Sequence, residues 1–246
     1  MNELDWDQVY RRGDKGPGVR RIQEWLCLHG FHISVDGDFG PATQAALKEF
    51  QQKSALPVTG EADKATFDAL VAPMRAALAN IDPQGRSFGE LVVAYAQQHF
   101  QQHPLEIGGQ NRGPWVRLYM DGNEGEEWPW CAGFATFIQR QAANTLGIAV
   151  PFLRTFSCDS LAAFGRETDC FQAEPTSKAE RDRIKPGSLF LRRRTSTDWV
   201  HTGIVTAVDD EVFKTIEGNT NDNGSREGYE VCARTRGYKN MDFVVF

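Results

Sequence analysis

Two hydrophobic patterns divide the second part of the chain, a helical spacing up to Leu146 and a strand spacing after about residue 185. Apolar residues recur at helical intervals in Phe88–Phe100 and in Cys131–Leu146, where Phe134, Phe137 and Ile138 form one side. Helices followed by strands are typical of an α+β domain with an antiparallel sheet. Short runs rich in branched and aromatic residues predict strands at 188–191, 200–208, 212–216, 229–233 and 243–246.

The first part of the chain contains an internal repeat over residues 12–72. Asp-Lys-Gly-Pro at 14–17 recurs as Asp-Phe-Gly-Pro at 38–41, so that Pro17 and Pro41 suit the first turn of a helix. Gly30 is well placed to end the first helix. A third group of apolar residues at helical spacing follows the second copy, and the whole predicts a compact unit of three helices.

This repeat resembles the peptidoglycan-binding domain found at the ends of many cell-wall hydrolases. The residues that carry the resemblance are Gly-Val-Arg-Arg-Ile-Gln at 18–23, Asp-Gly-Asp-Phe-Gly-Pro-Ala-Thr at 36–43 and Phe-Gln at 50–51. The alternative is a three-helix bundle in which these residues only shape turns and core. We therefore predict an all-α peptidoglycan-binding domain at 8–73, a linker at 74–86 and a catalytic domain at 87–246.

Composition and charge limit the partners that we expect. The chain has 246 residues, 41% of them hydrophobic, and a net charge of −6, which argues against nucleic acid and anionic membranes as partners. No stretch approaches the roughly 18 apolar residues of a membrane span. The first residues have neither the basic region nor the apolar run of a secretory signal. We expect synthesis in the cytoplasm, action on the cell wall after release or delivery, and a monomer.

Four residues in the second part form a candidate catalytic group. Cys131 lies where a helix begins, and the free N–H groups there stabilise a thiolate. His201 is a polar residue within an apolar strand, where it could serve as a base held against the cysteine. If a hairpin forms around 209–210, Glu217 and Asn219 return beside His201 and could orient its ring. Taken alone, each has an ordinary structural role as buried thiol, core histidine or strand-end polar group.

The combination is more specific than its parts. Trp-Cys-Ala-Gly-Phe at 130–134, His-Thr-Gly-Ile-Val at 201–205 and Glu-Gly-Asn at 217–219 resemble the CHAP family, the cysteine- and histidine-dependent amidohydrolases and peptidases. Asn-Arg-Gly-Pro at 111–114 adds to the likeness, which spans about residues 88–246. The resemblance implies a papain-like fold and no cofactor. It also implies Cys131 as nucleophile, His201 as base and Glu217 as its orienting group, with Asn219 assisting or sharing that role.

Two further groups of residues could be considered as metal sites, but an ordinary structural or surface role explains each of them better. The acidic segment 121–127 precedes the cysteine, as calcium loops do in some CHAP members, but it lacks their regular alternation. Cys27, His29 and His32 are close in sequence without a recognised fourth zinc ligand. We therefore expect no bound metal.

The expected function is hydrolysis of an amide bond in bacterial peptidoglycan. The sequence does not distinguish an N-acetylmuramoyl-L-alanine amidase from an endopeptidase, because both cleave an amide by the same chemistry. By analogy, a wall hydrolase without a secretory signal and with an N-terminal binding module resembles a phage endolysin. The alternatives are a secreted antibacterial effector and a non-catalytic wall-binding protein of a virion.

Overall fold

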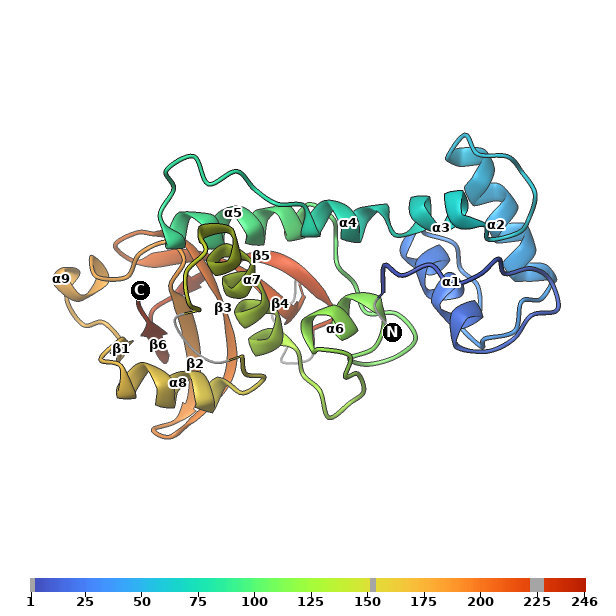
Figure 1. Ribbon diagram of the computed structural model, residues 1–246. Coiled ribbons are helices and arrows are strands. Elements are labelled where there is room, and N and C mark those ends of the chain that lie inside the picture. The colour runs from blue at the N-terminus through green and yellow to red at the C-terminus, as the bar shows by residue number, and fades with distance from the viewer. Residues whose placement is uncertain (1–2, 151–153, 222–227) are drawn as a thin grey trace.

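The computed structural model describes residues 3–150, 154–221 and 228–246. Three helices at the N-terminus lie at one end of the molecule, and a six-stranded sheet with its covering helices occupies the other (Figure 1). The helices are α1 (Pro17–Leu28), α2 (Pro41–Lys53), α3 (Lys64–Leu70), α4 (Ala72–Leu78), α5 (Phe88–Phe100), α6 (Pro114–Tyr119), α7 (Cys131–Leu146), α8 (Cys158–Glu167) and α9 (Lys178–Arg181). The strands are β1 (Phe171–Gln172), β2 (Leu189–Thr195), β3 (Asp198–Val208), β4 (Val212–Thr220), β5 (Glu230–Gly237) and β6 (Met241–Val244).

The internal repeat appears in the structure as two matching glutamine-centred turns. Buried Gln23 on α1 accepts from the backbone N–H of Gly37 at 2.7 Å and donates to the hydroxyl of Thr43 at 3.1 Å. Buried Gln51 on α2 binds the next copy in the same way, accepting from Gly60 N–H at 2.9 Å and donating to Thr66. Each glutamine therefore ties a helix to the turn that starts the following one.

The helix boundaries of this region follow from the residues at the ends. Pro17 and Pro41 are the first residues of α1 and α2, as predicted, where the missing N–H costs no hydrogen bond. Helix α1 ends at Leu28, and Gly30 has a left-handed backbone with φ of 85° that turns the chain back.

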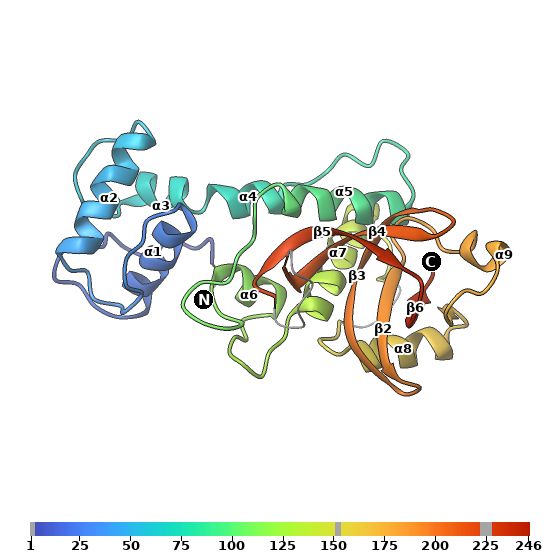
Figure 2. The ribbon, with the colours of Figure 1, turned by 180° about the vertical axis from the view of Figure 1, so that it is seen from behind.

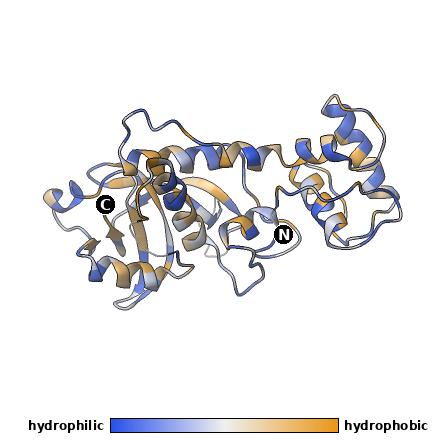
Figure 3. Cartoon of the chain, in the orientation of Figure 1, coloured by the Kyte–Doolittle hydropathy of each residue, from blue (hydrophilic) through white to orange (hydrophobic). Residues whose placement is uncertain are grey.

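The second part is built on one antiparallel sheet with the strand order β1-β6-β2-β3-β4-β5. Helix α7 packs against β3 and β4, α5 packs against α7, and α8 packs beside β3 and β6 (Figures 1 and 2). Apolar residues concentrate in the strands and in the helix faces turned toward them (Figure 3). A second, smaller cluster, which includes Phe190, Phe213 and Phe243, forms another part of the core.

A polar and aromatic contact joins the two parts. Trp25 of α1 and Trp115 of α6 are both buried, with ring centroids 6.2 Å apart in an edge-to-face arrangement. Arg117 on α6 forms ion pairs with Glu3 at 2.6 Å and with buried Glu24 at 2.7 Å. Burial opposes the charge of Arg117, but the carboxylates outweigh it and raise the pKa of the guanidinium further above its usual value.

All five predicted strands have a counterpart in the structure, whereas helices α6, α8 and α9 are not predicted by the sequence. Helices α5 and α7 have the predicted bounds, and α4 starts in the last two residues of the predicted first domain and continues into the segment predicted as a linker. Strand β4 continues past residue 216 to Thr220, and the short strand β1 is also not predicted. No helix among the described residues is long and apolar enough to cross a bilayer.

Candidate active site

The candidate site begins at the first residue of α7. Cys131 opens this helix, and the preceding Trp130 makes no side-chain hydrogen bond to the first-turn N–H groups. Instead the Trp130 indole donates to Glu106 at 2.8 Å and stacks on Tyr119 with ring centroids 5.6 Å apart. Glu106 and Tyr119 thus fix the residue before the helix, and the side chain of Trp130 leaves the N–H groups of the first turn uncapped.

The histidine and glutamate predicted from the sequence meet on adjacent strands. Nε2 of His201 on β3 lies 2.8 Å from Oε2 of Glu217 on β4. Both side chains are buried, with Glu217 at 0% exposure. Since Nε2 is engaged by the carboxylate, Nδ1 is the ring nitrogen left for the thiol of Cys131, and the pKa of each of these two groups is shifted by the other. The structure therefore brings together Cys131, His201 and Glu217.

Two glycines of the sequence motifs permit this close assembly. A Cβ on Gly203 would lie 2.6 Å from Cγ of Glu217, and a Cβ on Gly218 would lie 2.7 Å from Cβ of Phe134 on α7. Gly203 thus leaves room for the carboxylate, and Gly218 lets α7 approach β4. Any larger side chain at either position would push apart elements that carry the site.

The electrostatics favour a charged pair of thiolate and imidazolium. The pKa of Cys131 lies well below its usual value, chiefly because the thiol of Cys158 hydrogen-bonds to it and secondly because of His201, although burial opposes the shift. Burial disfavours the imidazolium, but Cys131 and Glu217 outweigh it and raise the pKa of His201 to about 9.

Arg236 is a member of this cluster that the sequence analysis missed. From β5 it donates to both oxygens of Glu217, at 2.6 Å and 2.5 Å. Burial alone would raise the pKa of Glu217, but Arg236 and His201 lower it to about 2. The carboxylate is therefore ionised at neutral pH. No local motif marks Arg236, because its role depends on the register of β5 against β4.

Asn219 takes a different position from Glu217. We expected both residues beside His201, but Asn219 has a left-handed backbone with φ of 53° where the β4–β5 register shifts, which interrupts the regular alternation of the strand. Its amide nitrogen lies 2.6 Å from Oδ1 of Asn111. With the amide turned over, its oxygen would accept from the backbone N–H of Trp130 at 3.3 Å. Asn219 therefore contacts the start of α7, while Glu217 contacts the imidazole.

Cys158 is the second unpredicted member of the cluster. It is the first residue of α8, and its sulfur lies 3.9 Å from that of Cys131. The pKa of Cys158 is raised well above its usual value, first by its hydrogen bond to Cys131 and then by burial. Two thiols thus face each other in the site, one favouring the thiolate and the other the protonated form.

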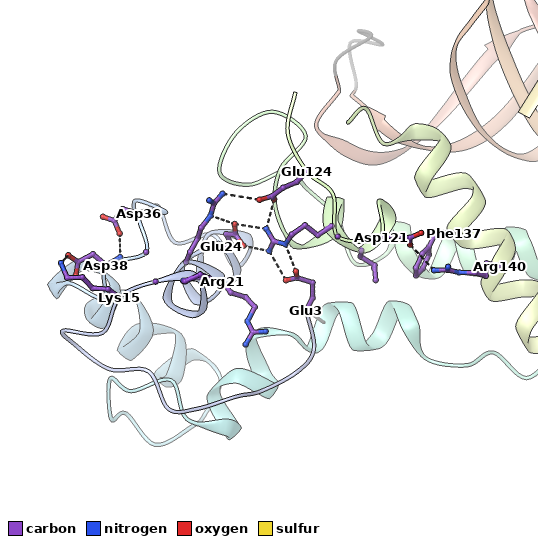
Figure 4. Close-up of a pocket in the computed structure, with 17 residues that line it drawn as sticks. Glu3, Lys15, Arg21, Glu24, Asp36, Asp38, Asp121, Glu124, Phe137 and Arg140 are labelled. Atoms are coloured by element: carbon purple, nitrogen blue, oxygen red, sulfur yellow. Dashed lines mark hydrogen bonds and ion pairs between the residues drawn. The ribbon is translucent and has the colours of Figure 1, made fainter. Parts of the chain in front are cut away.

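The groove between the two parts of the molecule is separate from this cluster. It has a volume of about 1030 Å³ and includes Arg20, Asp36, Asp121 and Arg140 in its lining (Figure 4). Neither Cys131 nor His201 nor Glu217 lines it. Many of its charged groups pair with one another, as Lys15 does with Asp38 at 2.6 Å.

The described residues contain no group of three or more His, Cys, Asp and Glu side chains arranged to hold a metal ion. His29 instead contacts the carbonyl of Leu70 at 2.8 Å, and Cys27 donates to the carbonyl of Ile33 at 3.4 Å. In the acidic segment before the helix, Glu124 pairs with Arg117 at 2.8 Å.

Comparison with known proteins identifies the N-terminal region. Residues 15–70 match the family described as "Putative peptidoglycan binding domain". The chain is similar to the zinc D-Ala-D-Ala carboxypeptidase of Streptomyces albus G, with 35% identity over 68 residues, covering 26% of this chain and 27% of that protein. It is also similar to the spore cortex-lytic enzyme of Bacillus cereus, with 44% identity over 66 residues, covering 26% of each.

Among solved structures, the N-terminal domain of SleB has 43% sequence identity, covers 27% of this chain and 93% of its own chain, and gives a TM-score of 0.27. The chain spans about a quarter of the length of the curated relatives that it matches. The protein therefore has a helical peptidoglycan-binding domain at its N-terminus, followed by a domain built on an antiparallel sheet.

Proposed function

We propose that this protein is a peptidoglycan hydrolase of the CHAP type, with a papain-like catalytic domain at 87–246, that cleaves an amide bond of the wall peptide. The observation that carries the proposal is the cluster of Cys131, His201 and Glu217, in which a thiol at a helix start faces an imidazole oriented by a buried carboxylate. Nucleophile, base and orienting group are the parts that acyl transfer requires. The peptidoglycan-binding domain at 15–70 supplies the substrate class.

In the proposed mechanism the thiolate of Cys131 attacks the amide carbonyl carbon. The N–H groups at the start of α7 stabilise the negative charge that develops on the carbonyl oxygen. His201 then donates its Nδ1 proton to the departing amine, which leaves a thioester on Cys131. Water, deprotonated by His201, hydrolyses the thioester and restores the thiolate. Throughout, Glu217 holds the ring through Nε2 and Arg236 holds Glu217.

Each remaining residue has a narrower proposed role. With its amide oxygen turned toward the backbone N–H of Trp130, Asn219 acts on the helix start, so that it supports the oxyanion site and leaves the orientation of the imidazole to Glu217. No step uses a metal or cofactor. The domain at 8–73 would hold the enzyme, acting as a monomer, on the bacterial wall, and residues 74–86 would connect the two domains.

Digestion of purified peptidoglycan tests the proposal and identifies the bond. Mass spectrometry of the released fragments identifies them and shows where the new amine lies. A new amine on L-alanine with a free lactyl carboxylate on muramic acid indicates an amidase, and a new amine within the peptide indicates an endopeptidase. Intact peptidoglycan that still binds the protein would instead support a non-catalytic wall-binding protein.

The biological setting remains a choice between two proposals with the same chemistry. We favour a phage endolysin, because a wall-binding domain precedes the proposed catalytic domain. A secreted antibacterial effector is the alternative. The test is expression of the protein in the bacterial cytoplasm. Two results together would favour the endolysin: the cells lyse only when a holin opens the inner membrane, and no secretion machine exports the protein.

A further inference from the structure

Cys158 is a buried nucleophilic group that the proposed reaction does not consume. It lies at the first residue of α8, whose N-terminus is capped by Ser157 through a bond to Ser160 N–H at 3.3 Å. Helix α8 packs beside β3, which carries His201. The fold therefore holds two helix starts together, each with a cysteine, and their sulfur atoms are 3.9 Å apart.

We propose that Cys131 and Cys158 form a reversible disulfide when the protein meets a peroxide, which makes this pair an oxidative modification site. A disulfide has a sulfur–sulfur distance of about 2.05 Å, so the two sulfur atoms must approach by about 2 Å, which rotation of side-chain torsions can supply. Cys27 and Cys170 contact backbone carbonyls, those of Ile33 and Thr168, whereas the thiols of Cys131 and Cys158 contact each other.

The two thiols are chemically unequal in the way that this reaction needs. Cys131 favours the thiolate, the form that attacks a peroxide, whereas Cys158 remains protonated. Cys131 is 6% exposed and Cys158 is 8% exposed. Hydrogen peroxide is close to water in size, so this narrow access is enough for it, while larger oxidants such as glutathione disulfide react more slowly.

The oxidation proceeds in two balanced steps. The Cys131 thiolate attacks one oxygen of hydrogen peroxide, the O–O bond breaks, hydroxide leaves, and Cys131 becomes a sulfenic acid. The sulfur of Cys158 then attacks the sulfur of Cys131, and the S–O bond breaks. The departing hydroxide takes the proton of Cys158 and leaves as water. One thiolate and one thiol are thus oxidised by two electrons to a disulfide, and one peroxide is reduced to one hydroxide and one molecule of water.

The consequence for activity rests on the proposed function, because a disulfide at Cys131 removes the nucleophile. The enzyme would then be inactive after oxidation and recover when a dithiol reduces the bond. Cys158 would also protect Cys131 from oxidation to the sulfinic acid, which simple thiols do not reverse.

Peptide mapping of the full-length protein tests the pair without relying on activity. The protein is treated with peroxide, unfolded, alkylated and digested with trypsin without reduction. Cys131 lies in the tryptic peptide 118–140, Cys158 in 155–166 and Cys170 in 167–178. We expect a cross-linked species of peptides 118–140 and 155–166, lighter than their sum by about 2 Da, that separates on reduction.

Two variants serve as comparison. In Cys158→Ser we expect no cross-link and progression of Cys131 to sulfinic acid, whereas Cys170→Ser is expected to give the same cross-link as the wild type. The proposal is overturned if Cys131 of the wild type reaches sulfinic acid while Cys158 is still alkylated, or if Cys131 pairs equally with other cysteines. If the cross-link forms but Cys131→Ala still hydrolyses peptidoglycan, the proposed function fails and this inference stands. If Cys131→Ala is inactive and no cross-link forms, the inference fails and the function stands.

Discussion

Arg236 donates from Nε to Oε1 of Glu217 at 2.6 Å and from Nη2 to Oε2 at 2.5 Å. The same Oε2 lies 2.8 Å from Nε2 of His201. Glu217 is therefore held from two sides. Its Oε2 contacts both the guanidinium of Arg236, which is always charged, and the imidazole of His201, which can lose its proton. This arrangement fixes the direction of the carboxylate and moderates how strongly it stabilises the imidazolium.

Replacing Arg236 tests its role as a positioning residue. In Arg236→Gln we expect hydrolysis to fall by about 10- to 150-fold, the equivalent of losing a charge-assisted hydrogen bond of about 1.5–3 kcal/mol. Without the cation, Glu217 stabilises the imidazolium more strongly, so the alkaline limb of the rate profile is expected to move to higher pH. Arg236→Lys keeps the charge and would recover part of the rate. A uniform loss of rate with an unchanged pH profile would indicate a merely structural role.

Glu217 and Asn219 are expected to differ in the size of their effects. Glu217→Gln removes the charge next to His201, and we expect a rate loss of about 10- to 150-fold, with a greater loss in Glu217→Ala. Asn219→Ala removes a contact with Asn111 or, with the amide turned over, with the backbone N–H of Trp130, and no contact with the imidazole, so a smaller loss is expected. Initial rates of dye release from labelled peptidoglycan, at matched concentrations of folded protein, make the comparison. A larger loss in Asn219→Ala would reverse the two roles.

The rate is expected to fall on the alkaline side as the pH rises through about 9. His201 has a pKa of about 9, above its usual 6.5, so the imidazolium that protonates the leaving amine persists until that pH. On the acidic side, activity should extend well below the usual pKa of a thiol, because Cys131 has a strongly lowered pKa. Measured rates of hydrolysis across the pH range provide the check. An alkaline limb near the ordinary pKa of histidine would contradict the charged pair.

His99 makes the stability of the fold depend on pH, because the pKa of this histidine is lowered in the folded protein, whereas that of His201 is raised. His99 is fully buried between Tyr119 and Gln141, each 2.8 Å from a ring nitrogen, and burial lowers its pKa from 6.5 to about 4. The unfolded chain therefore binds a proton more readily, and folding stability falls as the pH decreases from about 6.5 to about 4. The shift corresponds to about 3 kcal/mol in order of magnitude.

Denaturant unfolding of wild type and His99→Gln at several pH values measures this dependence. The difference in the free energy of unfolding between the two proteins should change between about pH 6.5 and about pH 4 and become constant below that range. Glu217 and His201 are present in both proteins, so their contributions cancel in the difference. A difference that is independent of pH would show that His99 does not contribute in this way.

Local sequence patterns predicted the parts of the fold that depend on neighbouring residues. The helix Cys131–Leu146 was predicted with its observed bounds, because it follows a Pro-Trp pair and apolar residues recur at helical spacing. In the structure its C-cap is Gly147, which has a left-handed backbone. Strand β4 was predicted too short, since Gly218 and Asn219 resemble turn residues. The structure accommodates them by the close approach of α7 and a change of register.

The candidate site could be predicted only as far as its motifs extend. Cys131, His201 and Glu217 lie in recognisable local sequences, and the structure brings them together. Arg236 and Cys158 lie in no such motif. Their places depend on strand pairing and on the packing of α8 against β3, which are set by contacts distant in sequence.

Hydrolysis of purified peptidoglycan by Cys131→Ala is the measurement that tests the central proposal most directly. The matched control is Cys170→Ala, which removes another free thiol of the same domain whose sulfur lies 3.5 Å from the carbonyl of Thr168, outside the cluster. We predict that Cys131→Ala binds peptidoglycan and keeps the circular dichroism of the wild type but releases no fragments above background, while Cys170→Ala stays active. Release of the same fragments by Cys131→Ala at a substantial fraction of the wild-type rate would contradict the assignment of Cys131 as the nucleophile.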